Sequence, residues 1–462
     1  MRRILILSLL YGLTWQAFPL ALAQTGWRAG VAEGKITPPV GTHLVGFETR
    51  TGPSRGIHDD LFVRALVVSR DITVTALVEA DLVMVSKEAV ASIRNEVSKQ
   101  TAIPPEHILI SATHTHGGPG LEGSYGQFFV KSSVETIVRA WQSRQPARIG
   151  AATVTHRGWV GFNRRHLESG FSPIDKQISI LKICDAQGRL QAILYNYSCH
   201  PACMGPDNLL VTADWPSYVA GRIRSKLGEE VKVLYFQGTE GDVNTGYSAG
   251  LSAIGVPIPT RTYAYAQEIG EVLANAILAR VPDMVLQSDG RLEARDEKVN
   301  IEYYSPSTVA DANARLAQAR AELRRAEEEH ALKSRIEAAR IAVSFAENDR
   351  ERAEDSLKIS QREYAAEIQA FRIGDAGFVS FPGEFFVEIG LGVKQRSPLH
   401  PTFLLGLAND SIGYIPTPEY YPEGGYEVSV ARFGPSTAAR WEEAAVRLLN
   451  QLSASTHLRS ER

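Results

Sequence analysis

The amino-acid sequence predicts an α/β fold, in which a central mixed β-sheet is flanked by helices. Residues 73–85 and 107–113 are apolar runs typical of buried strands. Residues 87–100 between them carry apolar side chains three or four positions apart, as one face of a helix does. This strand–helix–strand order is typical of a sheet whose two faces are covered by helices.

The same alternation continues along the chain. Residues 177–185, 191–199 and 231–238 are predicted as further apolar strands. Residues 217–227 and 265–281 have the apolar spacing of helices that pack on a sheet. We therefore expect one large sheet rather than a bundle or a sandwich.

A segment of different composition, about 305–365, follows. It is rich in Ala, Glu and Arg, and Ser305 and Pro306 are suited to the first turn of a helix. We expect a long helical insertion folded as a hairpin. It would be either a solvated arm or a lid or partner-binding arm. Residues 366–384 then predict two strands joined by a Gly-Asp turn. Because no repeat or linker is evident, residues 24–455 are interpreted as one elaborated domain.

The composition argues against two features: nucleic acid as a partner, and a framework of disulfide bonds. The 462 residues include 49 basic and 52 acidic side chains, for a net charge of −3. No basic face is implied, so nucleic acid is not an expected partner. The three cysteines, Cys184, Cys199 and Cys203, are too few for a disulfide framework. A large apolar core must therefore stabilise the fold.

The N-terminus has the pattern of a secretory signal peptide, residues 1–23. Arg2 and Arg3 precede an apolar run, and Ala21 and Ala23 supply the small residues of a cleavage site. The alternative is an uncleaved membrane anchor, but the run is short and is broken by Pro19. We expect cleavage after Ala23 and a secreted or periplasmic protein. No other stretch of the sequence is predicted to span a membrane.

Histidines follow two of the predicted strands. His114 and His116 come directly after residues 107–113, and a Gly-Gly-Pro-Gly turn follows them. In an extended segment, residues two apart point to the same side. Such a pair suits two metal ligands, or one ligand and one proton carrier. His200 follows another strand, which Pro201 ends.

A third strand is followed by the loop GTEGDVNTG, which carries Glu240, Asp242 and Asn244. The plainer interpretation of this loop is a simple turn. However, polar residues at the ends of several strands are how α/β proteins build functional sites. The three loops together favour a metal site over histidines that only fill space.

Seven segments together resemble the neutral/alkaline, non-lysosomal ceramidase family. The segment THTHGGPG (113–120) is similar to the family motif THTHSGPG. The other matching segments, in family order, are GIHDDLFVRALVV (56–68), GFNRR (161–165), NLLVTADWPS (208–217), GDVN (241–244), FPGEFF (381–386) and GYIPTPEYYPEGGYE (413–427). The resemblance extends from about residue 26 to residue 450.

This resemblance implies a zinc amidase. The family binds one zinc ion through two histidines, a glutamate and a tyrosine, and the matching positions are His114, His200, Glu384 and Tyr414. A zinc-activated water then attacks the scissile carbonyl. The resemblance also assigns His116 to proton transfer or oxyanion binding.

The remaining roles follow from the same resemblance. Arg164 matches a substrate-binding arginine, and Asp214 and Asp242 are expected to orient the ligands. Asn244 stands where the family has a serine, so a direct role for that serine does not carry over. Tyr421 is the nearest candidate for a second tyrosine. We also expect no immunoglobulin-like C-terminal domain, a domain that larger family members have.

The sequence thus predicts an exported zinc hydrolase that cleaves an amide (N-acyl) bond of a lipid or lipid-like molecule, with one zinc ion per chain. A small-molecule or lipid substrate is the expected partner, with contact to a membrane surface compatible with it. The oligomeric state does not follow from the sequence. Two alternatives stay open: a zinc hydrolase of another ester or amide metabolite, and a binding protein that retains zinc without catalysis.

The pentapeptide CHPAC (199–203) offers a different metal cluster, in which Cys199 and Cys203 would join His200 as ligands. If Cys199 continues its strand, however, its side chain points away from that of His200. Buried thiols or a local disulfide are the more ordinary expectation for these cysteines.

Overall fold

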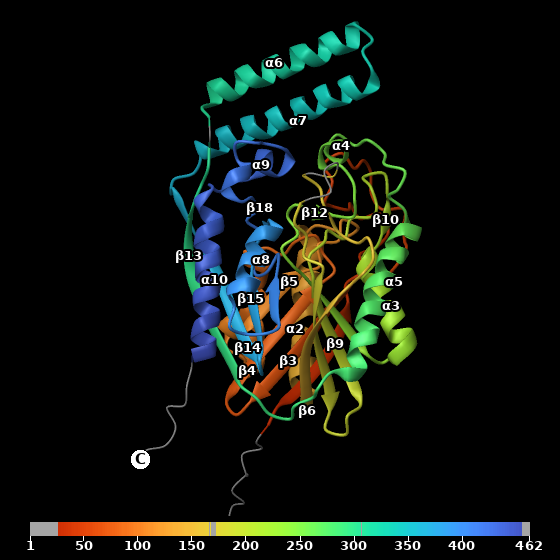
Figure 1. Cartoon of the computed structure of the whole chain (residues 1–462), viewed down its shortest axis with the longest axis vertical. Helices are drawn as coiled ribbons and strands as arrows, with labels where there is room; N and C mark the ends of the chain where they lie inside the picture. Colours follow the sequence, from red (N-terminus) through yellow and green to blue (C-terminus); the bar gives the residue numbers. More distant parts are fainter. Residues whose placement is uncertain (1–25, 166, 168–171, 306, 455–462) are drawn as a thin grey trace, which may run out of the picture.

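An eight-stranded mixed sheet forms the centre of the computed structural model (Figure 1), which describes residues 26–165, 167, 172–305 and 307–454. The predicted signal peptide lies outside these residues. The strand order is β11-β9-β8-β6-β1-β3-β4-β5. The strands are β1 (Arg28–Lys35), β3 (Phe62–Arg70), β4 (Thr73–Ala80), β5 (Ile108–Ala112), β6 (Gln145–Thr155), β8 (Gln177–Asp185), β9 (Leu190–Tyr197) and β11 (Lys232–Gln237).

The sheet consists of two four-stranded halves. They join where β1 pairs with β6, and that ladder comprises only Arg28 with Pro146 and Ala29 with Gln145. Each half has one parallel pair, β4 with β5 and β9 with β11, among antiparallel neighbours. The predicted strand–helix–strand unit is confirmed, because β4, α1 and β5 follow one another and the two strands are parallel.

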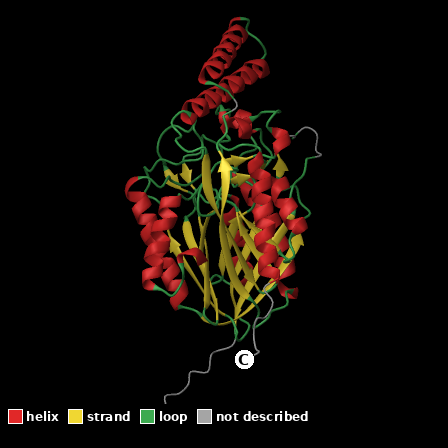
Figure 2. Ribbon diagram, turned by 90° about the vertical axis from the view of Figure 1, so that its left-hand side faces the viewer, coloured by secondary structure: helices red, strands yellow, loops and turns green. Residues whose placement is uncertain are grey.

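Helices cover the outer face of each half. α1 (Lys87–Gln100) and α2 (Gly123–Gln142) share an apolar core with β3, β4 and β5. α3 (Trp215–Leu227) and α5 (Tyr263–Arg280) share another with β8, β9 and β11. The ribbon in Figure 2 shows the strands inside and these helices outside. This arrangement agrees with the predicted mixed sheet flanked by helices.

A second, four-stranded sheet has the order β13-β14-β15-β17. Its inner face shares a central core with both halves of the large sheet, whereas α8 and α10 cover its outer face. The elements are β13 (Leu292–Glu302), β14 (Glu363–Ile373), β15 (Ala376–Ser380), α8 (Val387–Arg396), β17 (Thr402–Leu405) and α10 (Ser436–Ala454). The sequence patterns did predict the β14–β15 hairpin, but not that these strands form a separate sheet.

Two antiparallel helices, α6 (Val309–Glu328) and α7 (Lys333–Ser356), project at one end of the molecule (Figure 1). They leave and re-enter the second sheet at neighbouring points, because Glu302 at the end of β13 is paired with Glu363 at the start of β14. α7 packs against the short helices α4 (Ala249–Ala253) and α9 (Tyr426–Val430).

Short two-residue ladders hold the loops that follow the long strands. β2 pairs with β10, β7 with β12, and β16 with β18. Their bounds are β2 (Gly56–Ile57), β7 (Phe162–Asn163), β10 (Leu210–Val211), β12 (Val243–Asn244), β16 (Glu384–Phe385) and β18 (Tyr414–Ile415), and the 3-10 turns are η1 (Pro105–His107), η2 (Val281–Asp283) and η3 (Pro418–Tyr420). Among the described residues, no helix has both the length and the apolarity needed to cross a bilayer.

A buried ion-pair network crosses the first half of the large sheet. Arg64 on β3 donates to Glu33 on β1 (2.7 Å), to Glu79 on β4 (2.6 Å) and to Asp81 (3.2 Å). Arg64, Glu79 and Asp81 are almost completely buried. One guanidinium therefore neutralises carboxylates from several strands, and its loss leaves buried charges without a partner.

Replacing Arg64 with methionine is expected to lower the free energy of unfolding by about 3–5 kcal/mol, the cost of breaking a buried ion pair from one side. Urea denaturation measures the change. The matched control is Arg189→Met, since Arg189 also pairs with a carboxylate, that of Asp185 at 2.6 Å, but is 76% exposed. The control should lose less than about 1 kcal/mol. Equal small losses in both variants would contradict the predicted role of the network.

Candidate functional site

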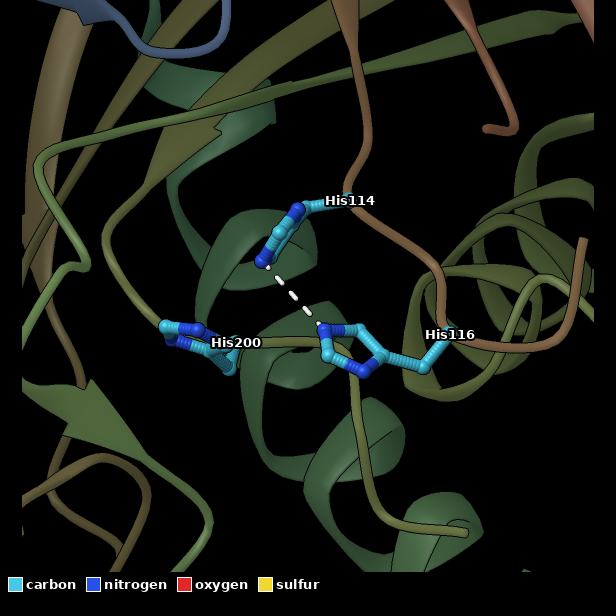
Figure 3. A group of neighbouring side chains, drawn as sticks. All are labelled: His114, His116 and His200. Atoms are coloured by element: carbon cyan, nitrogen blue, oxygen red, sulfur yellow. Dashed lines mark hydrogen bonds between the residues drawn. The ribbon is translucent and has the colours of Figure 1, made fainter. Parts of the chain in front are cut away.

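Three histidines from two different halves of the sheet converge in one buried cluster (Figure 3). His114 and His116 follow β5, whereas His200 follows β9. The rings of His114 and His200 have centroids 4.7 Å apart, and the Nε2 atoms of His114 and His116 are 3.3 Å apart. The two strand-end loops predicted to carry ligands thus meet in space.

Backbone carbonyls determine which nitrogen faces the cluster. Nδ1 of His114 donates to the carbonyl oxygen of Val83 at 2.6 Å. Nδ1 of His200 lies 3.0 Å from the carbonyl oxygens of both Glu240 and Val243. Because a carbonyl only accepts, the proton is on Nδ1 in both rings and the Nε2 lone pair is free. Metal-binding histidines in proteins usually have this arrangement: the ring nitrogen that does not bind the metal donates to a carbonyl or a carboxylate, which fixes the tautomer and the ring orientation.

The backbone at His114 is itself strained. Its φ of 72° lies in the left-handed region, which side chains with a Cβ rarely adopt. The conformation is held by a hydrogen bond from the His114 amide to the carbonyl oxygen of Leu82, 2.8 Å away. Strain of this kind gathers at functional sites, where surrounding contacts maintain it.

Glu384 and Tyr414 complete the cluster from the second half of the chain. They are direct partners in the parallel ladder of β16 and β18, so both side chains leave the backbone at the same level. Glu384 Oε2 lies 3.1 Å from His200 Nε2 and 3.3 Å from His114 Nε2. The Tyr414 hydroxyl lies 3.4 Å from His200 Nε2.

These distances fit a metal ion at the centre of the four groups. A tetrahedral site with bonds of about 2.0–2.1 Å has ligand atoms about 3.3 Å apart. Three of the six separations among the ligand atoms, His200–Glu384, His114–Glu384 and His200–Tyr414, run from 3.1 to 3.4 Å. Two lone pairs and a carboxylate oxygen that face one another also need a cation between them. The residues therefore fit a metal centre of histidine, carboxylate and phenol ligands.

His116 and His200 are neutral at neutral pH. Burial, and after it the neighbouring Arg164 guanidinium, lower the pKa of His200 to about 4. Burial and the adjacent His114 hold the pKa of His116 well below its usual value. Neutral imidazole is the form that binds a metal ion or accepts a proton.

Arg164 lies beside the cluster, immediately after β7. Its guanidinium donates to Glu427 Oε1 (2.6 Å), to the carbonyl oxygen of Gly241 (2.8 Å) and to the Tyr414 hydroxyl (3.2 Å). Its remaining nitrogen lies 3.4 Å from His200 Nε2. Arg164 therefore connects α9, the loop before β12 and Tyr414, and brings a positive charge to the edge of the site.

Three polar residues predicted to act at the site hold loops in place instead: Asp214, Asp242 and Asn244. None of them lines the cavity beside the histidine cluster. Asp242 accepts from Asn163 Nδ2 (2.6 Å) and from the Val387 amide (2.9 Å). Asp214 accepts from the amides of Trp215 (2.7 Å) and Met204 (3.2 Å), next to the His200 loop. Asn244 donates to the carbonyl oxygen of Tyr247 (2.8 Å) and accepts from the Gly246 amide, which closes a turn.

The structure does not bring Tyr421 to the cluster. Its hydroxyl donates to the carbonyl oxygen of Phe433 (2.6 Å), and its ring packs against Tyr304. Tyr426 lines the cavity instead, with its ring centroid 5.8 Å from that of Tyr414. Gly424 and Gly425, both at positive φ, turn the chain and present Tyr426. The Gly-Gly pair before Tyr426 is the sequence signal for this residue.

A cavity of about 420 Å³ opens onto the cluster. Residues from the N-terminal segment and from the loop after β4 give it an apolar wall, and α4 and α7 contribute small residues. The apolar part of the lining comprises Leu44, Val45, Phe47, Val83, Met84, Ala249 and Ala253, and Ser344 is the contribution of α7. A polar cluster beside an apolar wall suits a substrate with one polar and one hydrocarbon part.

The cysteines take no part in the cluster. Cys184, Cys199 and Cys203 are buried free thiols in the structure, in agreement with the plainer expectation. Burial raises the pKa of the Cys199 thiol, which keeps it protonated. Within the described residues, the groups that could hold a metal ion consist of histidine and glutamate only. The alternative CHPAC cluster receives no support.

The fold and the donor set together define a class: α/β proteins in which imidazole and carboxylate groups from several strand-end loops converge on one candidate metal centre. Residues 27–239 match the family model "Neutral/alkaline non-lysosomal ceramidase, N-terminal". This N-terminal part of the chain therefore matches the neutral/alkaline non-lysosomal ceramidase family, the family that the motifs predicted.

Two relatives show how much of the chain is shared. The neutral ceramidase of Drosophila pseudoobscura pseudoobscura is 28% identical over 231 residues, 43% of this chain and 32% of that protein. The neutral ceramidase of Pseudomonas aeruginosa is 22% identical over 491 aligned residues, 93% of this chain and 72% of that protein. The chain thus spans about a third of the Drosophila relative and most of the bacterial one.

A solved structure has the same fold. The crystal structure of neutral ceramidase from Pseudomonas aeruginosa superposes with a TM-score of 0.71, at 19% identity, over 95% of this chain and 77% of that chain. A ceramidase complexed with C2 superposes with a TM-score of 0.69, at 18% identity. The shared architecture includes both sheets, since nearly the whole chain is covered.

Proposed function

We propose that this protein is an exported, zinc-dependent hydrolase that cleaves an amide (N-acyl) bond of a lipid or lipid-like substrate. One observation carries the proposal: His114, His200, Glu384 and Tyr414 come from four separate loops, yet three separations that connect all four donor atoms have the edge length of one tetrahedral site. Relatives named neutral ceramidases support an amide bond as the target. Export follows from the predicted signal peptide.

These four residues would hold one zinc ion per chain. Histidine nitrogen and carboxylate oxygen are ordinary zinc ligands. Zinc in such a site supplies Lewis acidity, which polarises a carbonyl and makes a water molecule acidic near neutral pH. His116 and Tyr426 line the same cavity as the four groups, so a substrate carbonyl would enter beside them.

His116 is suited to move the proton. Its ring lines the cavity, packs against Phe47 with centroids 4.7 Å apart, and has no hydrogen-bond partner on Nδ1 among the described residues. A neutral imidazole in this position can take a proton from water and pass it to the leaving amine. Close packing leaves little freedom for the ring, because a Cβ atom on Gly46 would lie 2.7 Å from it.

Arg164 and its partners position the carbonyl end of the substrate. The guanidinium keeps the Tyr414 hydroxyl beside His200 and presents a positive charge to the cavity. Glu427 holds the guanidinium in one orientation through a 2.6 Å hydrogen bond. The apolar wall then accommodates the hydrocarbon part of the substrate. Asp214 and Asp242 act on the substrate only through the loops that they hold.

A panel of substrates tests the function. The purified protein is incubated with an N-acylsphingosine, an N-acyl amino acid and a fatty-acid ester of the same chain length, each with and without a chelator. We expect release of the fatty acid from an N-acyl amide, lost with chelator and restored by zinc. Turnover of the ester alone would favour the alternative hydrolase. Tight zinc retention without turnover of any substrate would favour the binding protein.

The helices α6 and α7 are proposed to be an insertion that roofs the cavity. Ser344 on α7 lines the cavity, and Arg352 donates to the carbonyl oxygens of Val428 (2.7 Å), Ser429 and Ala431 (both 3.1 Å) at the end of α9. α9 carries Tyr426 and Glu427. The two helices therefore support the cavity wall without contributing to the proposed ligand set.

Replacing residues 305–360 with a short Gly/Ser turn is expected to leave zinc content unchanged and to lower kcat/KM for a long-chain substrate by about 10- to 100-fold, because the cavity wall becomes misplaced. The change is tolerable in principle, since Glu302 and Glu363 are already paired. Metal analysis and steady-state kinetics measure the two effects. Loss of zinc or of the folded state would show that the helices belong to the core.

A further inference from the structure

Glu240 is an acidic side chain that the proposed mechanism does not use. It lies in the loop between β11 and β12 and is completely buried. Neither of its carboxylate oxygens has a hydrogen-bond partner among the described residues. A buried carboxylate without partners is costly, and in native structures each such group calls for an explanation.

The carboxylate of Glu240 faces the metal centre. A Glu240 oxygen, a Glu384 oxygen and a nitrogen of His114 all lie within 4.8 Å of one another. The backbone of the same residue also contacts the centre, because its carbonyl oxygen lies 3.0 Å from His200 Nδ1. Room for the side chain depends on Gly406, where a Cβ atom would lie 3.2 Å from Glu240 Oε2.

Glu240 stands apart from the close contacts that join the four proposed ligands. Separations of 3.1 to 3.4 Å join His200 to Glu384 and to Tyr414, and His114 to Glu384, whereas neither Glu240 oxygen has a hydrogen-bond partner among the described residues. The guanidinium of Arg164, which borders the cluster, is already bonded to Glu427 and to the Gly241 carbonyl oxygen. An arginine partner for Glu240 is therefore not at hand.

The charges of the centre explain why a second carboxylate is useful. His114 and His200 are neutral ligands, and Glu384 contributes one negative charge. A divalent cation thus keeps an excess positive charge in a buried site, where charge interactions are strong.

We propose that Glu240 is an outer carboxylate of the metal centre, which balances this excess charge and raises the affinity of the site for a divalent cation. It acts from beyond ligand distance, so the stoichiometry stays at one cation per chain. The inference rests on the metal site of the proposed function. The effect of Glu240 on protein stability should differ between the metal-bound and the metal-free protein. Glu240 stabilises the protein with metal and destabilises it without metal.

The test compares Glu240→Gln, which removes the charge and keeps the shape, with the parent protein. Zinc affinity is measured by competition with a chromophoric chelator, and the Tm is recorded with and without zinc. We expect zinc to bind about 10- to 100-fold more weakly, as for other outer partners of metal ligands. The Tm of the metal-free variant should equal or exceed that of the metal-free parent.

Two further variants act as controls. Glu240→Asp keeps the charge and should recover most of the affinity. Glu388→Gln removes another largely buried carboxylate, which accepts from the Tyr420 hydroxyl at 3.2 Å and is not part of the cluster, and it should bind zinc as the parent does. If Glu240→Gln does not fold, Glu240→Ala provides the same comparison with a smaller side chain.

Three results would overturn the inference. Zinc affinity of Glu240→Gln within threefold of the parent would remove the role. Two zinc ions in the parent and one in the variant would make Glu240 a direct ligand of a second cation. A lower Tm of the metal-free variant would indicate a structural role. These measurements need no substrate, so a parent that binds zinc tightly but cleaves no N-acyl amide would refute the proposed function and leave this inference standing.

Discussion

Replacing His200 with alanine is expected to reduce zinc from about one ion per chain to a small fraction and to abolish hydrolysis. Its Nε2 atom lies 3.1 Å from Glu384 Oε2 and 3.4 Å from the Tyr414 hydroxyl, so this side chain contacts two of the other proposed ligands. Without it, only one imidazole remains, and imidazole is the donor in this set that suits zinc best. His114→Ala and Glu384→Ala should act in the same way. Metal analysis after gel filtration measures the effect.

His107→Ala is the matched control for these variants. His107 is also a histidine whose Nδ1 bonds to a backbone carbonyl, that of Val74 at 2.9 Å, but it lies at the other end of β5 from His114. It should keep both zinc and activity. Full zinc occupancy in the His114, His200 and Glu384 variants would refute the assignment of the ligands.

The second large effect is expected for His116→Ala, with zinc kept and turnover reduced. General acid–base groups typically contribute about 100- to 10,000-fold. The side chain lines the cavity, and its Nδ1 atom is available for a proton. The effect should fall on kcat rather than on zinc content, which separates proton transfer from metal binding.

The geometry also allows the opposite outcome for His116, because its Nε2 atom lies 3.3 Å from that of His114 and the three histidines form one possible metal group. Loss of zinc in His116→Ala would therefore make it a ligand. Activity within a few-fold of the parent would leave it only a packing role against Phe47. Comparison with His116→Gln shows whether a hydrogen-bonding side chain of similar size restores turnover.

Much of the fold is predictable from local patterns. The strands β4 and β5 and the helix α1 follow from apolar periodicity within windows of about ten residues, which depends only on which face of an element is buried. The pairing of β13 with β14 across the α6–α7 segment does not follow, because Glu302 and Glu363 are brought together by a ladder between segments far apart in the chain. The division of the strands into two sheets is likewise a matter of long-range packing.

The site shows the same division. The family resemblance points to Tyr414, which lies beside Glu384 because β16 and β18 pair at these two residues. Counting along the chain selects Tyr421, but that side chain turns toward Phe433 and Tyr426 lines the cavity. Spacing in a loop does not determine side-chain direction when two glycines at positive φ intervene.

By itself, the sequence determined where donor groups stand along the chain: His114 and His200 directly after apolar strands, and Glu240 in a glycine-flanked loop. Only the tertiary structure decided that the first two meet, that their Nδ1 protons are bound to carbonyl oxygens, and that Glu240 is buried without a partner. The physical reason is range. Periodicity and turn chemistry act over a few residues, whereas convergence of side chains depends on how two halves of a sheet and a second sheet pack around a common core.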